Sequence, residues 1–111
     1  MEVRWLFNGK GIPIAFTFGG YAFLSDGDLL GKLVGREIWN LKYVAEIFAN
    51  NRIVRRLYRP LGSMEELAGW AAPPMPLAPA PMDELQLPSE MHELEMEPTV
   101  KPTPARAISM L

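Results

Sequence analysis

The chain has 111 residues, a formal net charge of −2 and no cysteine. Its length allows one small domain with an extension, and the absence of cysteine excludes disulfides and thiolate metal sites as a means of stabilising that domain. A net charge close to zero also excludes a generally basic surface of the kind that binds nucleic acid. The composition changes near residue 72, because all the aromatic residues precede this point and nine of the eleven prolines follow it.

The first third of the chain contains three aromatic residues at equal spacing: Phe7, Phe23 and Trp39 stand sixteen positions apart. Around each of them the sequence repeats an apolar strand-like run, a polar turn and an apolar pair that contains a small residue. A single hairpin is at best marginally stable in water, so units of this size must bury their apolar faces against each other. The pattern therefore predicts an all-β domain over residues 1–62, with four tandem β-hairpin repeats of about 16 residues arranged around an axis.

Turn residues mark the connections within these repeats in chain order. Asn8-Gly9, Asp26-Gly27 and Asn50-Asn51 supply residues that accept the positive φ of tight turns. The third unit, residues 38–48, lacks the turn glycine and is two residues shorter, which preserves the faces of its strands because side chains alternate with a period of two. The expected strands are residues 3–7 and 12–18, a run containing Tyr21 and Phe23, residues 29–34, the two arms of residues 38–48, and residues 53–58 of a degraded fourth unit.

Apolar pairs with one small member recur in the returning strands. They are Ile14-Ala15, Leu30-Gly31 and Val44-Ala45, with Leu61-Gly62 as a weaker echo in the fourth unit. In a ring of hairpins we expect the small residues to lie where the strands crowd against each other, because a larger side chain there would be overpacked.

These elements resemble the four-fold β-flower proteins, small bacterial proteins of hairpin repeats with aromatic, Asp-Gly and apolar-Gly elements. The resemblance covers about residues 5–62 and rests on residues 5–9, 21–31 and 37–47. Some members of that family carry proline-rich tails, as this chain does. The resemblance implies the fold and no established activity.

Beyond the repeats, Ser63-Met64-Glu65-Glu66 has the spacing of a capping box and predicts a short capping helix over residues 63–72. Residues 73–111 are rich in proline and methionine and acidic, so we expect a flexible tail. Within this tail, Leu87, Met91 and Leu94 have near-helical spacing that suits a partner groove. The alternative is an unstructured tail that only improves solubility.

No combination of residues predicts catalysis. The single histidine, His92, lies in the acidic tail, and turn chemistry accounts for Asp26 and Asp28. Glu90, His92, Glu93 and Glu95 approach the spacing of metal ligands but have no visible scaffold. We therefore expect no enzyme activity, no cofactor and no metal.

The most suggestive polar group is a cluster of four arginines, Arg52, Arg55, Arg56 and Arg59. Guanidinium groups pair with phosphate and stack on bases, so this cluster is the candidate binding site. Two plainer roles for the same charges stay open. They could protect an edge strand from pairing with another chain, or they could attract the acidic tail.

The sequence thus favours a non-enzymatic interaction or structural module, an adaptor for a protein partner that it contacts through an outer strand face or the tail. Nucleic-acid or phosphate-ligand binding through the arginine cluster is the alternative, and an enzyme of unknown type is the second alternative. The first residues lack a secretory signal, and no uncharged run reaches the roughly 20 residues of a membrane-spanning helix. We expect a cytoplasmic protein without membrane contact.

Overall fold

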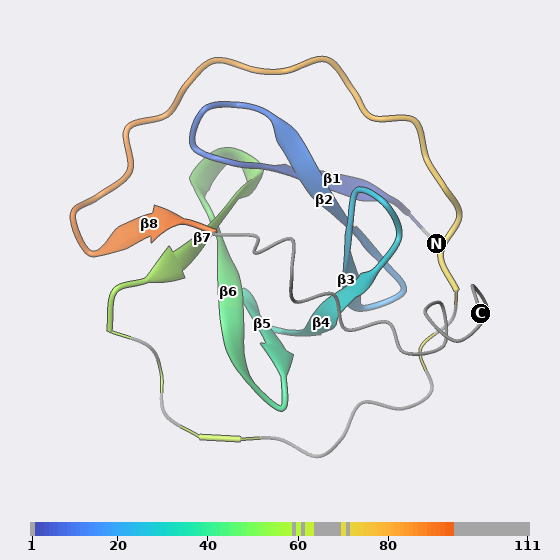
Figure 1. Ribbon diagram of the computed structural model, residues 1–111, viewed down its shortest axis with the longest axis horizontal. Coiled ribbons are helices and arrows are strands. Elements are labelled where there is room, and N and C mark those ends of the chain that lie inside the picture. The colour runs from blue at the N-terminus through green and yellow to red at the C-terminus, as the bar shows by residue number, and fades with distance from the viewer. Residues whose placement is uncertain (1, 59, 61, 64–69, 71, 95–111) are drawn as a thin grey trace, which may run out of the picture.

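The computed structural model describes residues 2–58, 60, 62–63, 70 and 72–94, and it confirms the all-β prediction (Figure 1). The short helix expected over residues 63–72 lies largely outside the described residues. The strands are β1 (Arg4–Phe7), β2 (Pro13–Phe18), β3 (Tyr21–Leu24), β4 (Leu29–Val34), β5 (Glu37–Asn40), β6 (Lys42–Phe48), β7 (Arg52–Arg56) and β8 (Met91–Glu93), with a 3-10 turn, η1 (Ala49–Asn51), before β7.

Strands β1 to β7 form a closed barrel. Each strand pairs in antiparallel fashion with the next, and β1 pairs with β7 in parallel through Phe7 and Arg52. This parallel closure follows from parity, because strand direction reverses at each of the six short connections and the first and seventh strands therefore point the same way. Beyond Arg52, the edge of β7 that does not pair with β6 pairs with β8 in antiparallel fashion.

The fourth unit differs from its prediction. The apolar-small pair at Leu61-Gly62 suggested a returning strand, but Gly62 is not in a strand, and residue 61 is not described. The strand that pairs with β7 comes instead from Met91–Glu93, far along the chain. The count of four consecutive hairpins is therefore not established by the fold.

The first three hairpins share one irregularity. The register shifts directly before each of the equally spaced aromatic residues, between Leu6 and Phe7, between Ala22 and Phe23 and between Ile38 and Trp39. In each case one extra residue lies on the partner strand, which makes a β-bulge and bends that strand around the barrel. The bulged residues are Ile14, Leu30 and Val44, the apolar members of the recurrent apolar-small pairs.

The small members of these pairs lie inside the barrel, as the sequence predicted. Ala15 and Ala45 are fully buried, and a Cβ atom added to Gly31 would lie 2.6 Å from the Trp39 carbonyl oxygen. A barrel of few strands has an interior that side chains fill completely, so small residues are needed where strands approach closely. The core cluster consists of Leu6, Ala15, Ala22, Ile38, Ala45, Ile47, Ile53 and Leu94.

Leu41, at the tip of the β5–β6 hairpin, shows what the lost turn glycine costs the third unit. It has a φ of 70° and a side chain that is 46% exposed. A left-handed conformation costs an ordinary L-residue roughly 1–2 kcal/mol, whereas Asn and Gly adopt it readily.

We therefore expect Leu41→Asn to raise the free energy of unfolding by about 1 kcal/mol, measured by urea denaturation. Leu41→Ala is the control, because it removes the same exposed side chain but keeps the conformational strain. An equal gain in both variants would show that the backbone conformation of Leu41 is not the source of the gain.

A second apolar layer covers the outside of β1, β2 and β3. The Trp5 and Phe16 rings lie 5.2 Å apart, and the Phe16 and Phe23 rings lie 5.6 Å apart in a stacked arrangement. Phe16 and Phe23 are fully buried although they are not part of the interior cluster. These large aromatic side chains therefore lie outside the barrel, whereas aliphatic side chains and alanines fill its interior.

The sequence suggested a flexible tail from residue 73 onward, and part of this segment is attached to the barrel. Residues 72–90, which we call the strap, run as an arc around the barrel and lead to β8 (Figure 1). β8 pairs with β7, and Leu94 joins the core cluster. The physical reason is that an acidic, proline-rich segment needs no core of its own when a barrel edge offers backbone partners. Within the described ranges no helix has the length and apolar character needed to cross a membrane.

Candidate interaction surface

The strap is attached to the barrel near its two ends. Just before it, the Trp70 ring lies 6.1 Å from the Phe23 ring. Towards its other end, the Met82 N–H donates to the Gly11 carbonyl at 2.9 Å and the Leu85 N–H donates to the Gly9 carbonyl at 2.7 Å. Between these anchors, residues 72–81 form no backbone hydrogen bond to the barrel, as expected of polyproline II segments.

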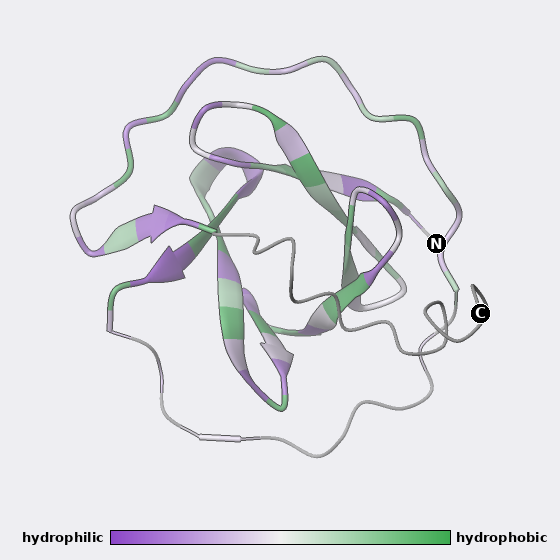
Figure 2. Cartoon of the chain, viewed as in Figure 1, coloured by the Kyte–Doolittle hydropathy of each residue, from purple (hydrophilic) through white to green (hydrophobic). Residues whose placement is uncertain are grey.

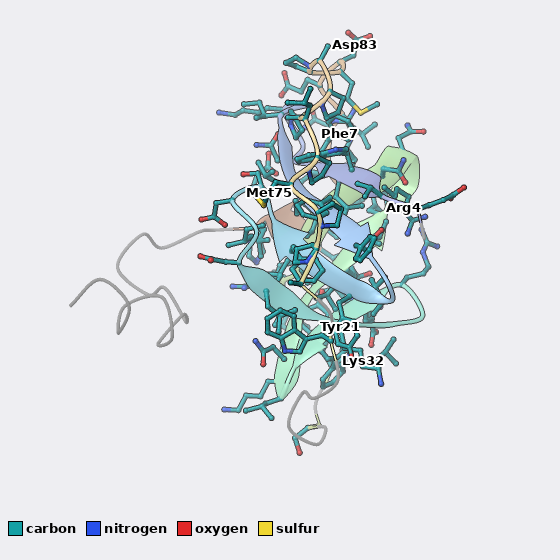
Figure 3. The ribbon with its side chains drawn as sticks, turned by 90° about the vertical axis from the view of Figure 1, so that its right-hand side faces the viewer. Arg4, Phe7, Tyr21, Lys32, Met75 and Asp83 are labelled. Carbon is teal, nitrogen blue, oxygen red and sulfur yellow. The ribbon has the colours of Figure 1, made fainter. Side chains whose placement is uncertain are left out.

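The middle of the strap exposes large apolar side chains. Leu77 is 93% exposed and Met75 is 63% exposed. Figure 3 shows the strap crossing in front of the barrel strands, with the Met75 label to its left and Asp83 at the top of the view. The Met75 sulfur lies 3.0 Å from the position of a Cβ atom built on Gly27, so it rests against the β3–β4 turn. Hydrophobic and hydrophilic residues alternate along the strap as they do along the barrel strands (Figure 2).

The buried Arg52 side chain connects the strap to the barrel through hydrogen bonds. Its side chain is 3% exposed, and its guanidinium group donates to the carbonyls of Asn8 at 2.9 Å, Gly9 at 3.2 Å and Asp83 at 2.5 Å. One side chain thus joins β7, the β1–β2 turn and the strap. Among the predicted binding residues, Arg52 is therefore a structural connector beneath the surface.

The other predicted arginines have different surroundings. Arg55 donates from Nε to the Val44 carbonyl at 2.8 Å, and Arg56 pairs with Glu46 at 2.5 Å and with Glu37 at 3.4 Å. Arg59 lies outside the described residues. The structure does not bring the three described arginines together as one cationic surface, because Arg52 contacts the strap whereas Arg56 contacts β5 and β6.

The acidic tail reaches the arginine strand through its backbone. The carbonyl of Asp83 accepts from Arg52, and β8 pairs residue by residue with Val54, Arg55 and Arg56. The Glu93 carboxylate accepts instead from the Gly9 N–H at 2.8 Å. His92, in β8, has its Nδ1 atom 3.0 Å from the Glu93 carbonyl.

A polar cluster borders a cleft of about 650 Å³ whose lining includes β5, β6, β7 and Met91 of β8. The Tyr43 hydroxyl donates to Glu46 Oε1 at 2.8 Å and accepts from the Arg56 N–H at 3.1 Å. Burial raises the pKa of Tyr43 to about 12, and the neighbouring Glu46 carboxylate adds to this rise. Glu46 and Glu37 both pair with Arg56, and Arg36 also lines the cleft, so two carboxylates lie near two guanidinium groups. This arrangement stabilises the barrel wall and offers no activated nucleophile.

Asp26 has the turn role that the sequence suggested for it, whereas Asp28 contributes its backbone N–H to the turn and is itself 2% exposed. The Asp26 carboxylate accepts from the Asp28 N–H at 3.0 Å, and the Gly27 N–H donates to the Leu24 carbonyl at 2.8 Å. These bonds form a side-chain-supported hairpin turn between β3 and β4.

Comparison of the chain with protein-family models, with curated protein sequences and with solved structures finds no match. Sequence reasoning missed two elements of the candidate surface, the anchoring of the strap by Arg52 and the docking of Glu93 on Gly9. Both contacts join residues far apart in the chain, and neither leaves a local pattern.

Proposed function

We propose that the chain is a non-enzymatic interaction module, an adaptor whose contact surface is the strap. The observation that carries this proposal is the exposure of Leu77 and Met75 on a segment that is fixed to the barrel on both sides. Exposed apolar side chains on a fixed ribbon resemble the anchors of a protein interface, because a partner gains their burial without ordering the segment first.

The chemistry of the strap indicates the class of partner. Residues 73–82 read Pro-Pro-Met-Pro-Leu-Ala-Pro-Ala-Pro-Met, and extended segments of this composition dock into grooves lined by aromatic side chains. Preformed polyproline II loses little conformational entropy on binding. We infer that the partner is a protein domain with such an aromatic groove.

The arginine cluster gives less support to the alternative, nucleic-acid binding, than the strap gives to the adaptor proposal. Nucleic-acid binding requires guanidinium groups that reach phosphates, and Arg52 and Arg56 are held by the strap and by Glu37 and Glu46. The adaptor proposal requires no rearrangement of the barrel.

We also propose that the barrel derives from four hairpin units, as the resemblance to the four-fold β-flower proteins implies. Leu6, Ala22, Ile38 and Val54 stand sixteen positions apart and are all fully buried. The first three lie opposite Ala15, Gly31 and Ala45, whereas Val54 lies opposite Glu93 of β8. In this proposal β8 has taken the place of the last returning strand.

The test is binding of the full chain to a panel of purified SH3 and WW domains, measured by calorimetry. We expect the double variant Met75→Ser, Leu77→Ser to lose at least tenfold in affinity, which corresponds to about 1.4 kcal/mol. The matched control replaces two half-exposed apolar residues outside the strap, Ile12→Ser and Val34→Ser, and should change affinity by less than about twofold. Equal losses in both variants, or no binding by any domain of the panel, would contradict the proposal.

A further inference from the structure

β8 lies along an edge of the barrel sheet, which we call the groove. Its backbone pairs with the C-terminal half of β7, where Val54 lies opposite Glu93, Arg55 opposite His92 and Arg56 opposite Met91. The Leu57 N–H extends this pairing by donating to the Glu90 carbonyl at 2.7 Å. The groove is thus an edge of the sheet onto which a short strand is added.

Side chains give this groove selectivity for its own strand. The Glu93 carboxylate accepts from the Gly9 N–H at 2.8 Å, and a Cβ atom on Gly9 would lie only 2.7 Å from the second carboxylate oxygen. The next residue, Leu94, is 7% exposed and packs into the core cluster. A glutamate followed by a leucine is therefore recognised in addition to the backbone, so the ligand that fits best is this segment of this sequence.

The contacts that hold residues 82–94 involve only the barrel, and they do not depend on which molecule the segment belongs to. Met82 and Leu85 bond to Gly11 and Gly9, and Asp83 bonds to Arg52. Before them, residues 72–81 form no backbone hydrogen bond with the barrel. Residues 72–81 can therefore connect residues 82–94 either to the barrel of the same molecule or to the barrel of another molecule.

The composition of residues 72–81 favours an extended conformation that leads away from the barrel. It contains Pro73, Pro74, Pro76, Pro79 and Pro81, and proline-rich chains stay extended over several residues. To reach its own groove the strap must curve around the barrel, as Figure 1 shows. A stiff connection that leads straight to a neighbour avoids this curvature while every contact of residues 82–94 is kept, and of the described contacts only that of Met75 with the β3–β4 turn is given up.

We propose that residues 82–94 of one molecule dock in the groove of a second copy, so that the chain forms a strand-exchanged dimer. The exchange is mutual, which gives a closed two-fold assembly with two identical β7–β8 junctions. The closed monomer and the dimer contain the same contacts between residues 82–94 and a barrel. Protein concentration therefore favours the dimer, and the high effective concentration of a tethered segment favours the monomer.

The test uses the fact that the chain has no cysteine. Directly opposed residues of antiparallel strands have Cα atoms about 4.5–5.5 Å apart, which suits a disulfide. The full-length variants Arg55→Cys and His92→Cys, carrying different tags, are refolded together and oxidised. We expect a covalent dimer of the two different chains, whose yield rises with protein concentration and exceeds severalfold that of a control pair, Arg55→Cys with Leu77→Cys.

A double variant, Arg55→Cys with His92→Cys in one chain, shows whether the groove is occupied at all. It should cross-link within the chain at low concentration and between chains at high concentration. If it cross-links only within the chain while the mixed pair stays at the control yield, the groove holds only its own strand and the proposal is overturned. If the double variant forms no cross-link of either kind, β8 does not dock in this groove, and the proposal also fails.

A further variant tests whether the stiffness of the proline-rich connection promotes strand exchange. Replacing Pro73, Pro74 and Pro76 by Ala makes the connection more flexible and changes no residue of the groove. We expect the yield of the mixed covalent dimer to fall severalfold at a fixed protein concentration, because a flexible connection returns more readily to its own barrel. An unchanged yield would overturn the proposal that the strap drives exchange.

Discussion

Replacing Gly31 by Val is expected to lower the free energy of unfolding by about 3 kcal/mol. A Cβ atom at this position would lie 2.6 Å from the Trp39 carbonyl oxygen and 2.9 Å from Ile38 Cγ2. The carbonyl belongs to the neighbouring strand β5, so β4 and β5 must separate to admit the side chain. Loss of this strand pairing is the reason for the large effect.

The matched control is Lys32→Val, one residue further along β4. Lys32 is exposed, and Val has a high strand propensity, so we expect a change within about 0.5 kcal/mol. Both variants are measured by urea denaturation with the slope of the transition checked for constancy. Equal destabilisation by the two substitutions would show that Gly31 does not occupy a crowded junction.

Replacing Arg52 by Met should lower the free energy of unfolding by about 3 kcal/mol. Methionine keeps much of the side-chain volume but leaves the carbonyls of Asn8, Gly9 and Asp83 without their shared donor. The loss of several charge-assisted hydrogen bonds at a buried site exceeds any gain from removing a charge, because the acceptors stay behind.

The same substitution should detach the strap, which gives a second measurement. Hydrogen exchange of the Met82 and Leu85 amides is expected to accelerate more than that of the barrel strands, since Arg52 bonds to the strap between them. Arg36→Met is the control, because Arg36 is exposed and its side chain donates to the Ile47 carbonyl at the longer distance of 3.3 Å. If both arginine variants behave alike, Arg52 is not the connector that the geometry indicates.

Local patterns predicted the barrel strands well. Turn residues such as Asn8-Gly9 and Asp26-Gly27 act over a few positions, and alternating apolar residues act over one strand, so both are visible in a short window. The pairs Ile14-Ala15, Leu30-Gly31 and Val44-Ala45 were recognised as a recurrent element, although their role as bulges depends on register and required the structure.

The attachment of the tail was beyond sequence reasoning. β8 has three residues in an acidic, proline-rich region, and no local propensity distinguishes them from their neighbours. Its docking depends on the edge of β7 and on Gly9, which become adjacent only when the barrel has closed. The arginines illustrate the same limit, because their spacing says nothing about whether a carbonyl, a carboxylate or a solvent molecule lies opposite.

The closure of the barrel has a mechanical consequence. β1 and β7 meet through one residue pair, Phe7 with Arg52, whereas every other neighbouring pair of barrel strands is joined by several. This line is therefore the seam of the cylinder. A pulling force that separates β1 from β7 would break the barrel first at this pair. The seven strands would then form one open antiparallel sheet.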